Sequence, residues 1–158
     1  MIKAAVLTIS DSCSKGQRED ISGQTIVDIL RKKGYAVCEN KIVADDIEKI
    51  TVELIRFSDQ ADCNLVFTTG GTGLGPRDVT PEATTAICEK LVPGLAELMR
   101  LKGLDKTPNA VLSRAIVGVR NSTLIVNLPG SPRAVRECLE AILDILPHAV
   151  EMIHGGGH

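Results

Sequence analysis

Short runs of apolar residues alternate with amphipathic helical patterns along this 158-residue chain. Nearly unbroken apolar runs are typical of strands that are buried on both faces. Strands that are joined through helices form a parallel sheet whose two faces the helices cover. We therefore expect an α/β fold with a doubly wound, mostly parallel sheet, in a single domain that spans residues 1–158. The expected parallel strands include 3–9, 35–43 and 65–68.

Helix-start signals follow these strands. A Ser, Thr or Asp side chain can accept a hydrogen bond from the first turn of a helix, and a following Pro strengthens the signal. The predicted starts are Asp45 or Asp46, Thr80 with Pro81 for a helix that reaches Leu91, Pro93, and Ser131 with Pro132. Pro147 is expected to kink or restart the last helix. Residues 115–120 and 123–127 predict an antiparallel hairpin near one edge of the sheet.

Composition argues against several classes of protein. The formal net charge is −2 and there are only two Phe, one Tyr and no Trp, so the basic surface and stacking rings of nucleic-acid binders are missing. No apolar run is long enough for a membrane span. Five cysteines without a CxxC pair indicate reduced thiols, and we expect a cytoplasmic protein. Residues 154–158 are expected to form a flexible tail.

A glycine-rich segment, TTGGTG, follows the third expected strand. Gly70, Gly71 and Gly73 can take positive φ angles and let the backbone approach a ligand closely, so that exposed N–H groups form a concavity for an anion. The segment lacks the Lys-Ser/Thr pair of a Walker loop. An ordinary turn after a strand is the alternative interpretation.

Asp78 follows the glycine segment and changes its interpretation. A carboxylate repels phosphate unless a divalent cation bridges the two, and Asp78 could hold such a cation. The alternative is that Asp78 only pairs with Arg77 or precedes the cap at Thr80.

Other polar segments also follow expected strands. They contain Ser10, Asp11 and Ser12, then Asp20, Ser22 and Gly23, then Asp45 and Asp46, and finally residues 127–132. Helix capping is the ordinary explanation for each of them. Because the carboxyl ends of parallel strands meet at one edge of a sheet, however, we expect these segments to converge on one crevice.

The segments VLTISDS, DISG, TTGGTG, RDVTPEAT and NLPGSPRAV resemble the molybdopterin adenylyltransferases of the MogA/MoaB type. The resemblance runs from about residue 3 to residue 153. It implies a doubly wound α/β domain, usually a homotrimer, that binds molybdopterin and ATP with Mg²⁺. Such a protein transfers AMP to the terminal phosphate of the pterin, releases pyrophosphate and passes the product to a molybdenum insertase. The alternative is a non-catalytic molybdopterin-binding or scaffolding homo-oligomer in the same pathway.

The resemblance also implies roles for individual residues. Asp78 matches the family's essential aspartate and Asp45 a second acidic position, so both are candidate catalytic residues and Mg²⁺ ligands. The remaining matched positions are expected to bind nucleotide or substrate. They are Ser10, Asp11, Ser22, Gly23, Thr69, Gly70, Gly71, Thr72, Gly73, Pro129, Gly130 and Ser131.

Overall fold

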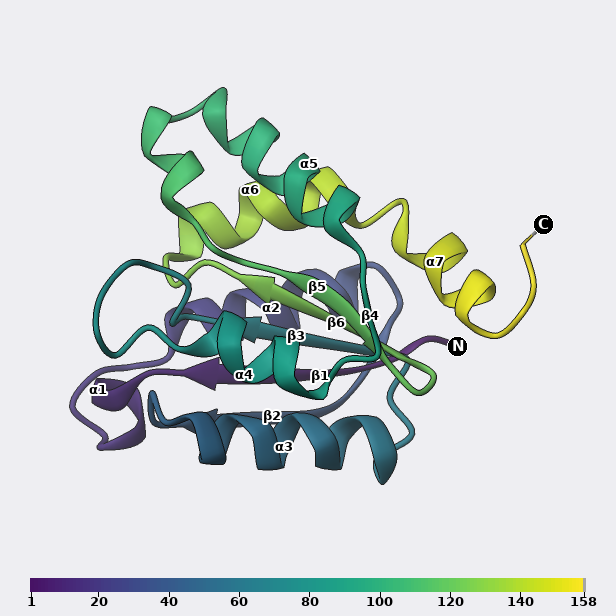
Figure 1. The fold of residues 1–158 in the computed structure, drawn as a ribbon, viewed down its shortest axis with the longest axis horizontal. Helices are drawn as coiled ribbons and strands as arrows, with labels where there is room; N and C mark the ends of the chain where they lie inside the picture. The colour runs from purple at the N-terminus through teal and green to yellow at the C-terminus, as the bar shows by residue number, and fades with distance from the viewer. Residues whose placement is uncertain (158) are drawn as a thin grey trace.

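A single six-stranded sheet forms the centre of the computed structural model, which describes residues 1–157 (Figure 1). The strand order is β2-β1-β3-β6-β5-β4. Strands β2, β1, β3 and β6 pair in parallel, whereas β5 is antiparallel to both β6 and β4. The predicted fold class and the hairpin near one edge are therefore confirmed. The strands are β1 (Lys3–Ile9), β2 (Ala36–Val43), β3 (Leu65–Thr69), β4 (Lys90–Leu91), β5 (Val117–Arg120) and β6 (Thr123–Leu128).

Helices cover both faces of the sheet, and in Figure 1 α5 and α6 lie above it and α3 below it. Alternation along β1 explains why both faces are needed. Ala4 and Val6 contact a core cluster with α2, α5 and α6, while Ala5 and Leu7 contact a second cluster with α3 and α4. The helices are α1 (Asp11–Ser14), α2 (Ile21–Lys32), α3 (Ile47–Asp59), α4 (Thr80–Ile87), α5 (Pro93–Leu104), the 3-10 helix η1 (Pro108–Leu112), α6 (Pro132–Ile142) and α7 (Leu146–Ile153).

Side-chain caps start α2, α3 and α6, among others. Asp20 accepts a 2.9 Å hydrogen bond from the Gly23 amide, Asp46 a 3.0 Å bond from the Lys49 amide, and Ser131 a 3.2 Å bond from the Ala134 amide. Of the two candidates before α3, Asp46 is therefore the cap. The carboxylate of Asp45 is left to make other contacts.

The prediction for Thr80 is wrong. Val79 occupies the N-cap position of α4, which has no side-chain cap, and the buried Thr80 hydroxyl donates instead to the carbonyl oxygen of Gly70 at 2.9 Å. The helix also ends at Ile87 rather than at Leu91. Residues 90–91 form the edge strand β4, because pairing with β5 satisfies backbone groups that a longer helix would have bonded internally.

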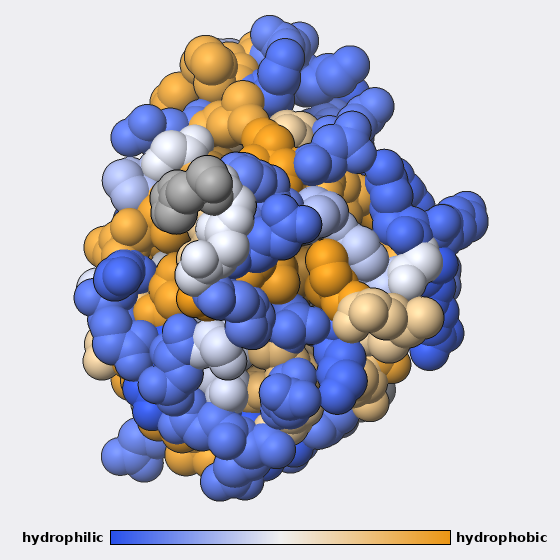
Figure 2. Space-filling model, turned by 90° about the vertical axis from the view of Figure 1, so that its right-hand side faces the viewer, coloured by the Kyte–Doolittle hydropathy of each residue, from blue (hydrophilic) through white to orange (hydrophobic). Residues whose placement is uncertain are grey.

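The end of the sheet beside α7 has a mixed surface, and Figure 2 shows apolar residues scattered among hydrophilic ones there. None of the helices within residues 1–157 is long and apolar enough to cross a membrane. The backbone amides of residues 154–156 bond to the last turn of α7, and His158 lies outside the described residues. The flexibility of 154–158 stays a prediction.

Candidate active site

The loops that follow β1, β2, β3 and β6 meet at one edge of the sheet and surround a cleft of about 310 Å³. This is the geometry expected when parallel strands end together. The polar strand ends therefore do converge on one crevice. The residues around the cleft are Thr8, Ile9, Ser10, Cys13, Arg18, Glu19, Asp20, Ile21, Ser22, Asp45, Thr69, Gly70, Gly130, Ser131 and Pro132.

The glycine segment approaches its neighbours too closely for a side chain. Gly70 has φ +99° and Gly71 has φ +70°, and a Cβ atom added to Gly70 would lie 2.2 Å from the carbonyl oxygen of Ile9. A Cβ atom at Gly71 would lie 2.2 Å from the Thr80 hydroxyl oxygen. Gly73 differs from the prediction, because its φ is not positive. Close contact with Asp78 explains Gly73, since an added Cβ atom would lie 2.9 Å from Oδ2 of Asp78.

A reciprocal pair of hydrogen bonds joins the loops after β1 and β2. The Asp11 amide donates to Oδ2 of Asp45 at 2.9 Å, and the Asp45 amide donates to Oδ1 of Asp11 at 3.0 Å. Arg77 also donates to both carboxylate oxygens of Asp11, at 2.9 and 3.1 Å. The hydrogen bonds from Arg77 and from the Asp45 amide lower the pKa of Asp11. Asp11 thus ties three segments of the site together.

Asp78 does not form the ion pair with Arg77 that was the alternative interpretation, because Arg77 pairs with Asp11. Oδ2 of Asp78 instead accepts a 2.9 Å hydrogen bond from the Gly75 amide. The carboxylate therefore turns back over its own loop, beside Gly73.

Asp45 lies near two other carboxylates, those of Asp11 and Asp78, and near the guanidinium of Arg77. Burial raises the pKa of Asp45, and the nearby charges of Asp11 and Asp78 raise it further, against the lowering effect of the hydrogen bond from the Asp11 amide. Oδ1 of Asp45 lies 3.3 Å from the point where a Gly71 side chain would begin. Asp45 and Asp78 are thus both placed against the glycine loop.

These two carboxylates fit a Mg²⁺ site that a substrate completes. Within residues 1–157 there is no group of three or more His, Cys, Asp or Glu side chains that could hold a metal ion. Mg²⁺ needs no such group, because it is commonly bound by one or two carboxylates together with substrate phosphates and water. Of the two carboxylate oxygens of Asp45, only Oδ2 accepts a hydrogen bond within residues 1–157, so Oδ1 is available to a cation.

Some predicted residues lie outside the cleft or have a structural partner. The Gly23 amide bonds to Asp20, and an added Cβ atom would lie 2.3 Å from the Thr8 hydroxyl oxygen, so Gly23 lets α2 pack against β1. Thr72 is buried, and its carbonyl oxygen accepts a 2.9 Å bond from the Arg114 amide. The binding roles assigned to the site residues stay predictions.

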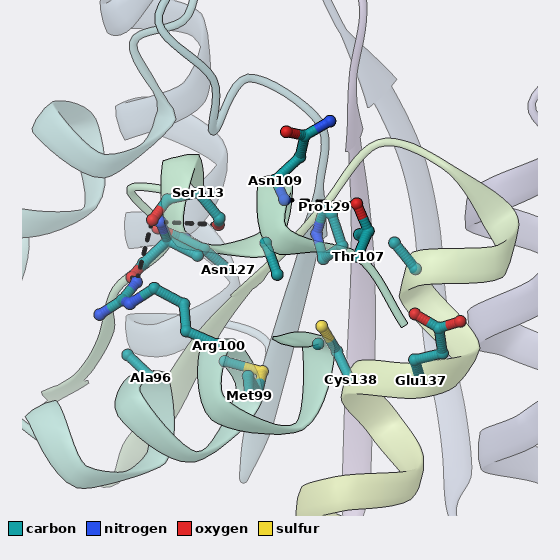
Figure 3. Close-up of a pocket in the computed structure, with 14 residues that line it drawn as sticks. Ala96, Met99, Arg100, Thr107, Asn109, Ser113, Asn127, Pro129, Glu137 and Cys138 are labelled. Carbon is teal, nitrogen blue, oxygen red and sulfur yellow. Dashed lines mark hydrogen bonds between the residues drawn. The ribbon is translucent and has the colours of Figure 1, made fainter. Parts of the chain in front are cut away.

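Pro129 lines a second, mostly apolar cavity of about 220 Å³ between α5, η1 and α6 (Figure 3). Its walls include Met99 and Arg100 from α5 and Cys138 from α6. The carbonyl oxygen of Pro129 accepts a 2.7 Å hydrogen bond from Thr69. Since Gly130 borders the main cleft, residues 129–130 separate the two cavities.

Reasoning from the sequence missed three polar residues near the site. Arg18 and Glu19 line the cleft and belong to the polar segment after the first strand, whose composition was the available signal. Arg114 contacts the glycine loop from the segment before β5, where no local motif marks it.

Comparisons with known proteins show which family this chain resembles. Residues 5–148 match the model of a family described as a probable molybdopterin binding domain. The chain is 47% identical over 156 residues to the molybdopterin adenylyltransferase of Helicobacter pylori J99, covering 98% of this chain and 89% of that protein. It is 35% identical to the Escherichia coli K12 protein of the same name, covering 98% and 79% of the two chains.

A solved structure extends the likeness to three dimensions. The crystal structure of the molybdopterin biosynthesis enzyme MoaB from Thermus thermophilus superposes with a TM-score of 0.93 at 47% identity, covering 98% of each chain. Sequence and fold therefore agree, and the chain belongs to the family of molybdopterin-binding domains of the MogA/MoaB type.

Proposed function

We propose that this protein is a nucleotidyltransferase that transfers AMP from ATP to molybdopterin and releases pyrophosphate, in molybdenum cofactor biosynthesis. The relatives named molybdopterin adenylyltransferase match nearly the whole chain. The single observation that carries the proposal is the position of Asp45 and Asp78 against a glycine loop at the ends of the parallel strands.

Phosphoryl-group chemistry depends mainly on positioning and on neutralising charge, and the site offers both. Backbone amides of the glycine loop are proposed to hold the phosphates of ATP. Asp45 and Asp78 would hold Mg²⁺, which when bound neutralises phosphate charge. The hydroxyls of Ser10, Ser22 and Ser131 border the cleft and can donate hydrogen bonds to either substrate.

In the transfer step, an oxygen of the terminal phosphate of molybdopterin attacks the α-phosphorus of ATP. A new P–O bond forms there, while the bond between the α-phosphorus and the bridging oxygen of pyrophosphate breaks. The contribution of this chain is to align the attacking and leaving oxygens and to keep the carboxylates in place.

The Asp78→Asn variant tests the proposal. Asn keeps an oxygen that can accept the Gly75 hydrogen bond but removes the negative charge, so we expect the fold and molybdopterin binding to survive. Pyrophosphate release from ATP with molybdopterin should fall by about 10²-fold or more. Asp46→Asn is the matched control, because Asp46 caps α3 and should be catalytically neutral.

Full activity of Asp78→Asn would contradict the assignment. Molybdopterin binding by the wild-type protein without ATP-dependent release of pyrophosphate would instead support a non-catalytic binding or scaffolding protein.

We also propose a homotrimer in the cytoplasm that passes its product to a molybdenum insertase. Exposed apolar side chains on α5 and η1 could contribute to a subunit interface, and all five cysteines are free, as expected in a reducing compartment. The exposed apolar residues are Leu101, Leu104, Val111 and Leu112. Light scattering would test the trimer by a mass three times that of the chain.

A further inference from the structure

Arg114 reaches across to the glycine loop from the segment between η1 and β5. Its Nε donates to the carbonyl oxygen of Gly73 at 2.8 Å, and its Nη2 donates to the carbonyl oxygen of Asp78 at 2.8 Å. Its Nη1 pairs with both carboxylate oxygens of Glu82, at 2.8 and 2.9 Å. The backbone amide of Arg114 also donates to the carbonyl oxygen of Thr72 at 2.9 Å. One residue therefore holds three carbonyl groups of one loop.

Apart from Arg114, the ion pair between Arg77 and Asp11 ties the middle of this loop to the segment after β1, and backbone bonds hold its two ends. The Gly70 amide bonds to the carbonyl oxygen of Leu128 at 3.2 Å, and the Thr80 amide bonds to the carbonyl oxygen of Gly71 at 3.1 Å. Between these ends, residues 72–79 belong to no helix or strand. The 3.0 Å bond from the Asp78 amide to the carbonyl oxygen of Gly75 is internal to the segment and cannot anchor it to the rest of the fold.

Two bonds of the Arg114 guanidinium bracket the part of the loop that carries the Asp78 carboxylate. They fix the carbonyl groups of Gly73 and Asp78, and the Asp78 carboxylate lies beside Gly73. The planar guanidinium donates in fixed directions, so it sets the spacing of two acceptors in a way that a single ammonium group does not.

We propose that Arg114 is a positioning residue for Asp78: its guanidinium joins the carbonyl groups of Gly73 and Asp78 and so sets where the Asp78 carboxylate stands in the site. The inference rests on the proposed function for its catalytic consequence, whereas the ordering of the loop by Arg114 does not depend on it. The pair with Glu82 orients the guanidinium. Both partners are more than a third exposed, so this ion pair alone contributes little.

The test uses three variants. Arg114→Ala removes every side-chain contact to the loop. Glu82→Gln removes the charge of the ion-pair partner but keeps both carbonyl contacts. Arg120→Ala is the matched control, because Arg120 also pairs with a carboxylate (Asp59) and donates to a carbonyl group (Ile87), and neither partner belongs to the loop.

We expect Arg114→Ala to lower kcat for pyrophosphate release by about 10²-fold, since small displacements of a positioned group have effects of that size. Because molybdopterin binding does not depend on the Asp78 charge in this scheme, KM for molybdopterin should change less than about twofold. Hydrogen exchange of the backbone amides of residues 72–78 should become faster, except at Pro76, which has no N–H. Glu82→Gln and Arg120→Ala should leave kcat and exchange near the wild-type values.

Unchanged exchange in residues 72–78 of Arg114→Ala would overturn the inference, as would an equal loss of kcat in Glu82→Gln or Arg120→Ala. If the wild-type protein itself releases no pyrophosphate, the proposed function fails, and the exchange measurement still decides the role of Arg114. Should Arg114→Ala not fold, Arg114→Lys replaces it. We then expect the same pattern with a smaller amplitude, because an ammonium group lacks the fork that spans both carbonyl groups.

Discussion

The Gly70→Ala substitution should destabilise the protein by more than the cost of placing alanine at a positive φ angle. Gly70 has φ +99°, and a Cβ atom there would lie 2.2 Å from the carbonyl oxygen of Ile9 at the end of the interior strand β1. β1 pairs with strands on both sides and cannot retreat easily. Either β3 must shift, weakening the bond from the Gly70 amide to Leu128, or the loop must refold.

Two costs add in the Gly70→Ala variant. A positive φ angle costs an L-residue about 1–2 kcal/mol, and forcing a group into packed structure costs about 1–3 kcal/mol. We therefore expect the free energy of unfolding to fall by about 2–5 kcal/mol. Gly34→Ala is the control, because Gly34 has φ +85° and nothing lies within 4 Å of its added Cβ atom. This control should lose only the first cost, about 1–2 kcal/mol.

Urea unfolding of both variants and the wild type, at one fixed protein concentration, measures the two costs. The difference between the variants isolates the contact with Ile9. Equal destabilisation of Gly70→Ala and Gly34→Ala, within about 0.5 kcal/mol, would refute the argument from close approach.

Two further predictions concern charge and thiols. Burial raises the pKa of Glu53, but hydrogen bonds from Lys41 and Arg56 outweigh it and leave that pKa below its ordinary value of 4.5. Glu53 therefore contributes stability that is complete above about pH 4.5 and is lost as the pH falls through the lowered pKa. The Glu53→Gln variant should accordingly lose less stability than the wild type on acidification. Urea unfolding at each pH measures this difference. In the native protein, iodoacetamide should modify the exposed Cys38 first, because burial raises the pKa of three other thiols to about 11 and hinders access to them. Peptide mass spectrometry follows the modification of each cysteine. Early modification of these three would contradict this; they are Cys63, Cys88 and Cys138.

Part of the site could be predicted because local sequence patterns carry it. The loop after β3 needed glycine at 70 and 71, and the structure shows positive φ angles at both positions. The carboxyl ends of the parallel strands had to meet at one edge, so Ser10, Asp45 and Ser131 border one cleft. The prediction for Thr80 failed because a buried hydrogen bond across the loop, to Gly70, replaced the local capping bond.

The alternation of apolar runs and helical patterns determined the α/β fold, because burial on two faces of a sheet leaves its signature in every strand. Only the tertiary structure decided the partners of the charged groups. Arg77 pairs with Asp11, 66 residues away, rather than with its neighbour Asp78, and Arg114 holds Asp78 from 36 residues away. Local patterns report backbone preference and burial, whereas these ion pairs and hydrogen bonds depend on which loops the finished sheet brings together.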